Sequence, residues 1–103
     1  MRIHFSRTGG FTGMRLAITI DSDALPEDEV QMLQSELDNA HFFELPIHLS
    51  QEGSGADRFQ YEITVEDGSK KHTITAGETA LPGHVQPLVQ HLERLARTAR
   101  SSG

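Results

Sequence analysis

Six histidines are the residues of this chain best suited to metal chemistry, and their spacing decides whether that chemistry is supported. They are His4, His41, His48, His72, His84 and His91. A zinc site needs short ligand spacings such as His-x-x-x-His or His-Glu-x-x-His, or a cysteine partner, and the sequence has none of these. We therefore expect no metal site and no cofactor. His91 lies beside Glu93 and Arg94, which predicts a solvent-exposed position on a polar arc of a helix.

The Gly-rich segment at residues 6–13 is the second candidate for chemistry. A phosphate-binding loop would end in Lys-Ser or Lys-Thr and lead into a helix, whereas this segment leads into alternating apolar residues. Catalysis by Ser6 or Thr12 would need a base within hydrogen-bond reach, and no nucleophile elbow or paired-carboxylate motif marks one. The acidic residues 27–29 are explained by the dipole of a helix that begins there. The sequence therefore predicts a protein that is not an enzyme.

The same segment is better suited to binding another protein. Gly9 and Gly10 allow backbone conformations that are closed to other residues. Phe11 is a single bulky side chain between glycines; it either folds back onto the core or anchors a partner, and the sequence leaves both open. Arg7 adds a cationic side chain with several donors. The candidate binding loop consists of Ser6, Arg7, Thr8, Gly9, Gly10, Phe11 and Thr12.

The charge balance excludes two classes of partner. Acidic residues outnumber basic ones by 15 to 9, which gives a formal net charge of -6. Nucleic acids and anionic membranes are bound by clustered Lys and Arg, so we expect neither as the main partner. The chain has no cysteine, no signal-like apolar run at its start and no stretch near the roughly 20 apolar residues that span a bilayer. We expect a soluble cytoplasmic protein. Export by a route that needs no N-terminal signal is left open as an alternative.

The 103 residues fit a single domain, residues 1–103, with a frayed tail from about residue 100, and we expect a monomer. Alternating apolar residues predict two strands of a hairpin, at residues 2–5 and 14–20, joined by a loop of about eight residues. Apolar residues at helical spacing predict one helix over about residues 26–39 and a longer one from about residue 85, with Pro87 in its first turn.

A second hairpin is predicted between the two helices. Residues 59–66 alternate, residues 69–76 return, and Asp67 with Gly68 is a strong two-residue turn signal. That turn places Ile63 opposite His72 and Tyr61 opposite Ile74, so His72 shares the core face. The order is strand, strand, helix, strand, strand, helix (ββαββα). We expect an α+β domain with an antiparallel sheet of about four strands and both helices on one face.

Several short motifs together resemble the emfourin family over nearly the whole chain. They are Met1-Arg2-Ile3, residues 6–13, Leu25-Pro26, Phe42-Phe43-x-Leu45-Pro46, Ala56-Asp57-x-Phe59-x-Tyr61 with Thr64-Val65, and the Leu-Pro pair before the last helix. Emfourins are small bacterial protein inhibitors of thermolysin-like metallopeptidases, especially protealysin-like enzymes, beside whose genes they are often found. The resemblance implies a competitive inhibitor whose partner is such a peptidase.

The resemblance and the Gly-rich segment suggest a common mechanism. Thermolysin-like peptidases accept a large apolar side chain just beyond the scissile bond, and Phe11 could occupy that pocket. Ser6, Thr8 and Thr12 could bond to the cleft, and Arg7 could meet its acidic rim. The alternative is a non-inhibitory adaptor that binds another protein through a helix surface or through the polar sheet face around Thr64, Thr73 and Thr75.

Overall fold

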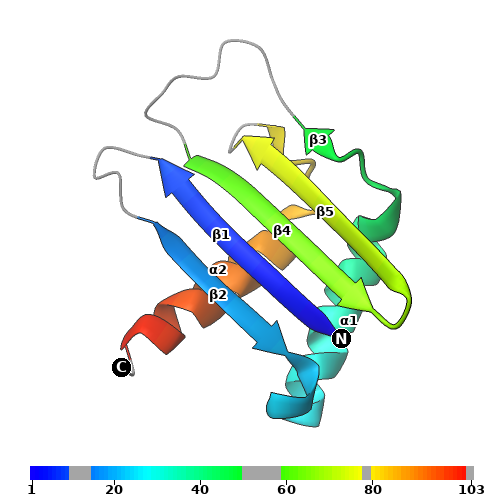
Figure 1. The fold of residues 1–103 in the computed structure, drawn as a ribbon, viewed down its shortest axis with the longest axis vertical. Helices are drawn as coiled ribbons and strands as arrows, with labels where there is room; N and C mark the ends of the chain where they lie inside the picture. The colour runs from blue at the N-terminus through cyan, green and yellow to red at the C-terminus, as the bar shows by residue number, and fades with distance from the viewer. Residues whose placement is uncertain (10–14, 50–58, 78–79, 102–103) are drawn as a thin grey trace.

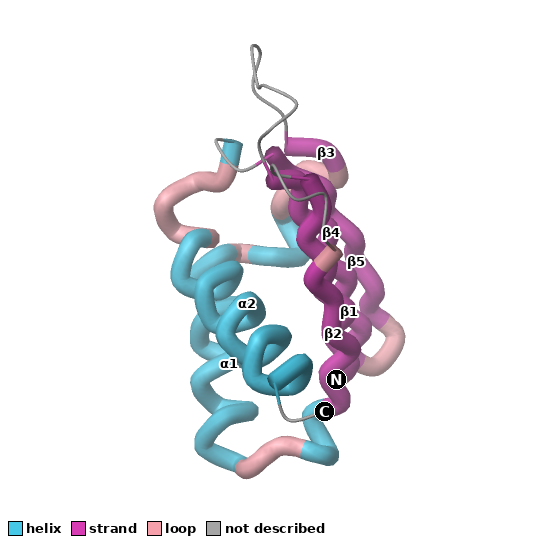
Figure 2. Tube along the Cα trace, turned by 90° about the vertical axis from the view of Figure 1, so that its left-hand side faces the viewer, coloured by secondary structure: helices cyan, strands magenta, loops and turns pink. Residues whose placement is uncertain are grey.

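Five strands form one mixed sheet and two α-helices cover one of its faces in the computed structural model, which describes residues 1–9, 15–49, 59–77 and 80–101 (Figures 1 and 2). The strands are β1 (Arg2–Gly9), β2 (Leu16–Asp21), β3 (His48–Leu49), β4 (Phe59–Asp67) and β5 (Lys70–Gly77), in the spatial order β2-β1-β4-β5-β3. The helices are α1 (Glu27–Ala40) and α2 (Gln86–Ser101). The predicted α+β class and the single helix-covered face are confirmed.

The core lies between the sheet and the helix layer, where the alternation in the sequence points apolar side chains inward. β1 contributes Ile3 and Phe5, and β4 contributes Ile63 and Val65; each of these four side chains is almost fully buried. The two strands are central and pair antiparallel, with Phe5 opposite Ile63. The intervening residues face the other side of the sheet, which no helix covers in the part of the chain described.

Each helix buries the stripe that its apolar spacing predicts. α1 buries Leu33, Leu37 and Ala40, and α2 buries apolar residues at the same spacing, Leu88, Val89, Leu92 and Ala96. The predicted limits of α1 are confirmed within one residue: Pro26 is the N-cap and three acidic residues occupy the first turn. Pro87 is the second residue of α2, where a missing backbone N–H costs little. α2 runs to Ser101, and residues 102–103 lie outside the described residues.

The sheet has one strand more than the four expected, and that strand is parallel. β3 has only two residues, and it pairs with Thr75 and Ala76 of β5. The adjacent backbone adds a hydrogen bond, from the N–H of Thr75 to the carbonyl oxygen of Ile47, at 2.8 Å. Two residues are too few to produce a period of two in the sequence, which is why the alternation gave no sign of this strand.

The turn between β4 and β5 lies one residue later than predicted. The loop residues are Gly68 and Ser69, and Asp67 pairs with Lys70. Gly68 has a φ of 63°, and glycine at the first loop position is typical of a type II′ turn. Ile63 therefore faces Ile74, and His72 faces Val65. Because the register changes by two positions, the predicted faces are kept, and His72 lies half-buried on the core side, 5.6 Å from the Phe42 ring.

Candidate functional site

The predicted binding loop begins inside a strand. β1 continues to Gly9, so Ser6, Arg7, Thr8 and Gly9 are strand residues, and the expectation that the strand ends at residue 5 is wrong. Ser6 and Arg7 pair with both β2 and β4, and pairing with β4 alone carries the strand two residues further, to Gly9, which the sequence of β1 and β2 does not indicate. Gly10, Phe11 and Thr12 lie outside the described residues. The connection to β2 leaves β1 after Gly9, whose φ of 96° lies in a region that favours glycine.

The strand residues of the predicted loop lie on both sides of the sheet. Ser6 and Thr8 face the side without helices, where they line a shallow depression of about 300 Å³ together with Gln60 and Glu62. Thr8 is exposed, whereas Ser6 is buried to 6% exposure between its neighbours. Apart from Ala17, which lies opposite Ser6, the side chains that surround this depression are mostly polar, which suits hydrogen bonding more than apolar anchoring.

Arg7 points to the other side, toward the helix layer, and its guanidinium has two partners within the protein. Nη1 donates to Oε2 of Glu93 on α2 in an ion pair whose side chains are only 17% and 15% exposed. The guanidinium carbon also lies 4.2 Å from the centre of the Phe59 ring at the start of β4. We call Arg7, Phe59 and Glu93 the Arg7 cluster. It joins β1, β4 and α2 at the end of the sheet from which the Gly-rich segment departs.

Two chain connections leave the sheet beside this cluster. Gly9 and Phe59 are paired across β1 and β4; the connection to β2 begins after Gly9, and residues 50–58 precede Phe59. Pairing between β1 and β2, in contrast, reaches only as far as Arg7 opposite Leu16. Thr8 and Gly9 are therefore paired to β4 alone among the described strands, and Arg7, directly before them, contacts α2 through Glu93.

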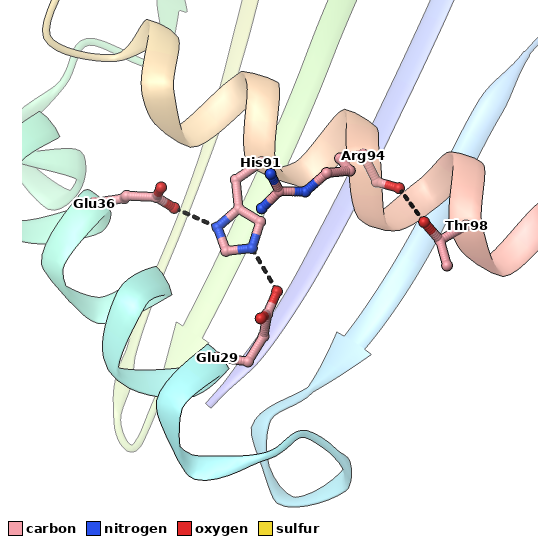
Figure 3. Close-up of polar contacts among 5 residues, drawn as sticks. All are labelled: Glu29, Glu36, His91, Arg94 and Thr98. Carbon is pink, nitrogen blue, oxygen red and sulfur yellow. Dashed lines mark hydrogen bonds and ion pairs between the residues drawn. The ribbon is translucent and has the colours of Figure 1, made fainter.

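A second charged cluster lies two residues earlier on α2, and the exposed position predicted for His91 is wrong. The residue is 3% exposed, its Nδ1 is 2.6 Å from Oε1 of Glu36, and its Nε2 is 2.6 Å from Oε1 of Glu29 (Figure 3). Carboxylates only accept hydrogen bonds, so a ring nitrogen that bonds to a carboxylate oxygen must donate to it. We call Glu29, Glu36 and His91 the His91 cluster. It connects α1 to α2.

The sequence did contain a signal for this cluster. His91 stands three residues after Leu88 and four before Leu95, so it occupies the apolar stripe of α2 although its neighbours are charged. On α1, Glu29 and Glu36 are seven residues apart and therefore share a helix face. A histidine within an apolar stripe and two carboxylates at this spacing indicate a buried polar contact between helices.

Three of the other five histidines form a hydrogen bond with a residue outside their own element, and Nδ1 of His41 lies 3.3 Å from Oε2 of Glu44. Nδ1 of His4 lies 3.0 Å from Oγ1 of Thr19, Nδ1 of His48 lies 2.8 Å from Oγ1 of Thr75, and Nε2 of His72 lies 2.7 Å from the carbonyl oxygen of Leu45. Across the described ranges, no group of three His, Cys, Asp or Glu side chains has the geometry to hold a metal ion. Neither α1 nor α2, over the residues described, is long and apolar enough to cross a membrane.

Comparison with known proteins gives one result. A family model described as Emfourin matches residues 5–93, which include both charged clusters and all five strands except the start of β1. No curated protein and no solved structure matches the chain significantly.

Proposed function

The chain belongs to the emfourin family, and on that premise we propose that it inhibits thermolysin-like zinc metallopeptidases, with protealysin-like enzymes as its targets. Emfourins are an inhibitor family, so membership implies a peptidase partner in general. The observation that carries the proposal is the family match over residues 5–93. The proposed mechanism is competitive: the segment after β1 enters the active-site cleft and excludes the substrate.

The position of the segment supports this mechanism. It leaves the sheet at Gly9, where β1 and β4 are paired and the Arg7 cluster ties β1 to α2. A binding segment supported at its base by a sheet and a helix loses less conformational entropy when it enters a cleft. Phe11 is the proposed apolar anchor in the pocket beyond the scissile bond, and Thr8 and Thr12 are proposed to bond to the cleft walls.

The adaptor alternative has weaker support. One of its two proposed surfaces, the polar face around Thr64, Thr73 and Thr75, consists of hydroxyls that already have partners; the other is a helix surface. Oγ1 of Thr64 lies 2.9 Å from Oγ1 of Thr73, and Thr75 bonds to His48. The strand residues described on that face include no large apolar side chain. Protein interfaces draw most of their binding energy from buried aromatic or arginine anchors. The described strands present no Phe, Tyr or Trp on this face, and its Arg2 lines a polar depression together with Glu66 and Lys71.

The experiment is a steady-state titration against a purified protealysin-like peptidase that cleaves a short peptide. Stoichiometric, substrate-competitive inhibition is expected, and Phe11→Ala should weaken it by at least about tenfold, a loss of about 1.4 kcal/mol of binding free energy. The matched control is Phe43→Ala, because Phe43 is 36% exposed and contacts Lys70 at the opposite end of the sheet. Full inhibition by folded Phe11→Ala would contradict the role of Phe11, and no inhibition by the wild type would contradict the proposed function.

A further inference from the structure

Arg7 was expected from the sequence to face the peptidase, and its surroundings suggest a different role. Its guanidinium contacts a carboxylate of α2 and an aromatic ring of β4, and its side chain is 17% exposed. A guanidinium engaged in this way presents little free surface to an acidic rim on another protein. Its charge is also compensated, because Glu93 lies against it.

We propose that Arg7 positions the base of the inhibitory segment by fixing β1 to α2 through Glu93 and to β4 through Phe59. The proposal rests on the proposed function, since it assigns a positioning role within the same inhibitory site. It adds Phe59 and Glu93, which lie outside the Gly-rich segment, to the residues on which inhibition depends. None of the three residues contacts the peptidase in this arrangement.

The pairing of the strands explains why this contact matters at position 7. Lateral support from β2 ends at Arg7 opposite Leu16, and the two following residues are paired with β4 alone in the described sheet. A strand end held on one side can bend out of the sheet more easily than one held on both. The Arg7 cluster adds a contact with the helix layer at the last position that β2 supports.

Phe59 extends the effect to the neighbouring connection. It pairs with Gly9 and directly follows residues 50–58, so the ring that packs on Arg7 belongs to the residue where that connection meets the sheet. The two connections therefore leave the sheet from paired residues whose positions depend on one guanidinium. Arginine suits this role because its planar group pairs with a carboxylate and stacks on a ring at the same time.

A double-mutant cycle on the inhibition constant tests the proposal. The variants are Arg7→Met, which keeps an apolar stem against Phe59, Glu93→Gln, which keeps the shape of the side chain, and the pair together. Each single change should raise the inhibition constant by about tenfold. The inhibition constant of the double variant should agree within about twofold with that of the less inhibitory single variant, because both changes break the same contact. Phe59→Leu should weaken inhibition to a similar extent.

Other outcomes would overturn the proposal. If Arg7 contacted the peptidase directly, Arg7→Met would weaken inhibition while Glu93→Gln would leave it unchanged. Independent roles for the two residues would make the losses multiply in the double variant. The matched control is Arg97→Gln, because Arg97 is 64% exposed and lies 3.6 Å from the same carboxylate oxygen of Glu93; it should leave inhibition unchanged.

A readout without any peptidase separates this proposal from the proposed function. Successive N–H groups of a strand point to opposite sides, so one of the two amides of Thr8 and Gly9 is directed at β4. Hydrogen exchange of that amide should accelerate in both single variants and remain unchanged in Arg97→Gln, since loss of the cluster frees the strand end. Unchanged exchange at the amide directed at β4 would overturn the positioning role. A wild-type protein that fails to inhibit would contradict the proposed function alone and would leave the exchange result to decide whether Arg7 holds the strand end.

Discussion

The two charged clusters on α2 use similar chemistry for different purposes. The His91 cluster joins α2 to α1, and its imidazole side chain is 2% exposed between two carboxylates. The Arg7 cluster joins α2 to the sheet, and both of its charged side chains keep some contact with solvent, at 17% and 15% exposure. A deeply buried charge contributes mainly to stability, because losing its partner leaves an uncompensated charge. Losing a partly exposed ion pair at the end of a strand costs less stability. We expect such a pair to act mainly on the position of the strand end.

The largest expected effect is on stability, in the His91 cluster. His91→Leu removes both ring nitrogens from between Glu29 and Glu36 and leaves the two carboxylates without their partner. Breaking a buried pair costs about 3–5 kcal/mol in general. Because these glutamates are 28% and 18% exposed and can hydrate, we expect a smaller loss of about 2–3 kcal/mol in the free energy of unfolding. Urea denaturation measures this loss, and the inhibition constant of the folded fraction should not change.

The control for this variant removes the carboxylates as well. His91→Leu combined with Glu29→Gln and Glu36→Gln should recover at least half of the loss, since no charge is then left unpaired. Stability equal to the wild type in the single variant would mean that the His91 cluster contributes nothing net.

The next effect concerns the backbone beside the Arg7 cluster. Gly9→Ala places a Cβ at a φ of 96°, and we expect a cost of about 1–2 kcal/mol together with weaker inhibition, because the strand end must relax. Gly68→Ala is the matched control: its φ of 63° gives comparable strain at the opposite end of the sheet, with no atom within 4 Å of the added Cβ. Both variants should lose stability in thermal unfolding, but only Gly9→Ala should lose inhibition. Equal inhibition constants for the two variants would show that the conformation at Gly9 does not matter to binding.

A smaller effect distinguishes the two carboxylates of the His91 cluster. Glu36→Gln and Glu29→Gln each keep an acceptor oxygen for the ring, so we expect losses of about 1 kcal/mol or less. Glu36→Gln should cost more, because Glu36 is less exposed than Glu29, at 18% against 28%. Parallel urea titrations of the two variants measure the difference, and the reverse order would mean that exposure does not set the strength of these contacts.

The smallest effect is expected for an ion pair outside both clusters. Nζ of Lys71 lies 3.4 Å from Oε1 of Glu66 on the open face of the sheet, where the side chains are 65% and 42% exposed. Solvent screens such pairs, so Lys71→Gln should change the free energy of unfolding by about 0.5 kcal/mol or less and leave inhibition unchanged. A larger loss in the free energy of unfolding, measured by urea denaturation, would mean that this pair contributes more to stability than ordinary surface charges do.

Periodic patterns in the sequence predicted most of the fold. The features that these patterns missed depend on contacts between residues distant in sequence. Ile3 with Phe5, and Ile63 with Val65, predicted strands and their inward faces, because alternation is a local property of the chain. β3 was missed because two residues form no pattern, and the second turn was misplaced by one residue because glycine suits either loop position.

The candidate site was less predictable from the sequence for the same reason. Arg7 stands out in the sequence as a cation beside the glycines, but its partner Glu93 lies 86 positions away, and no local pattern connects the two. His91 was judged from its charged neighbours in sequence, whereas its position in the apolar stripe of α2 was the better guide. The candidate loop residues Gly10, Phe11 and Thr12 lie outside the described residues, and their role remains a proposal.

The central pairing of β1 with β4 has a consequence for the order of folding. Each hairpin closes locally, but Phe5 meets Ile63 only after 58 further positions of chain have been made. Pairing over such a separation in sequence is slow relative to hairpin closure, so joining the two hairpins is the expected late step. Gly9 meets Phe59 in that same step. A nascent chain that ends before β4 would carry the whole Gly-rich segment without the strand that supports it. Because the Arg7 cluster also needs Glu93, full inhibition should arise only once synthesis has passed that residue of α2.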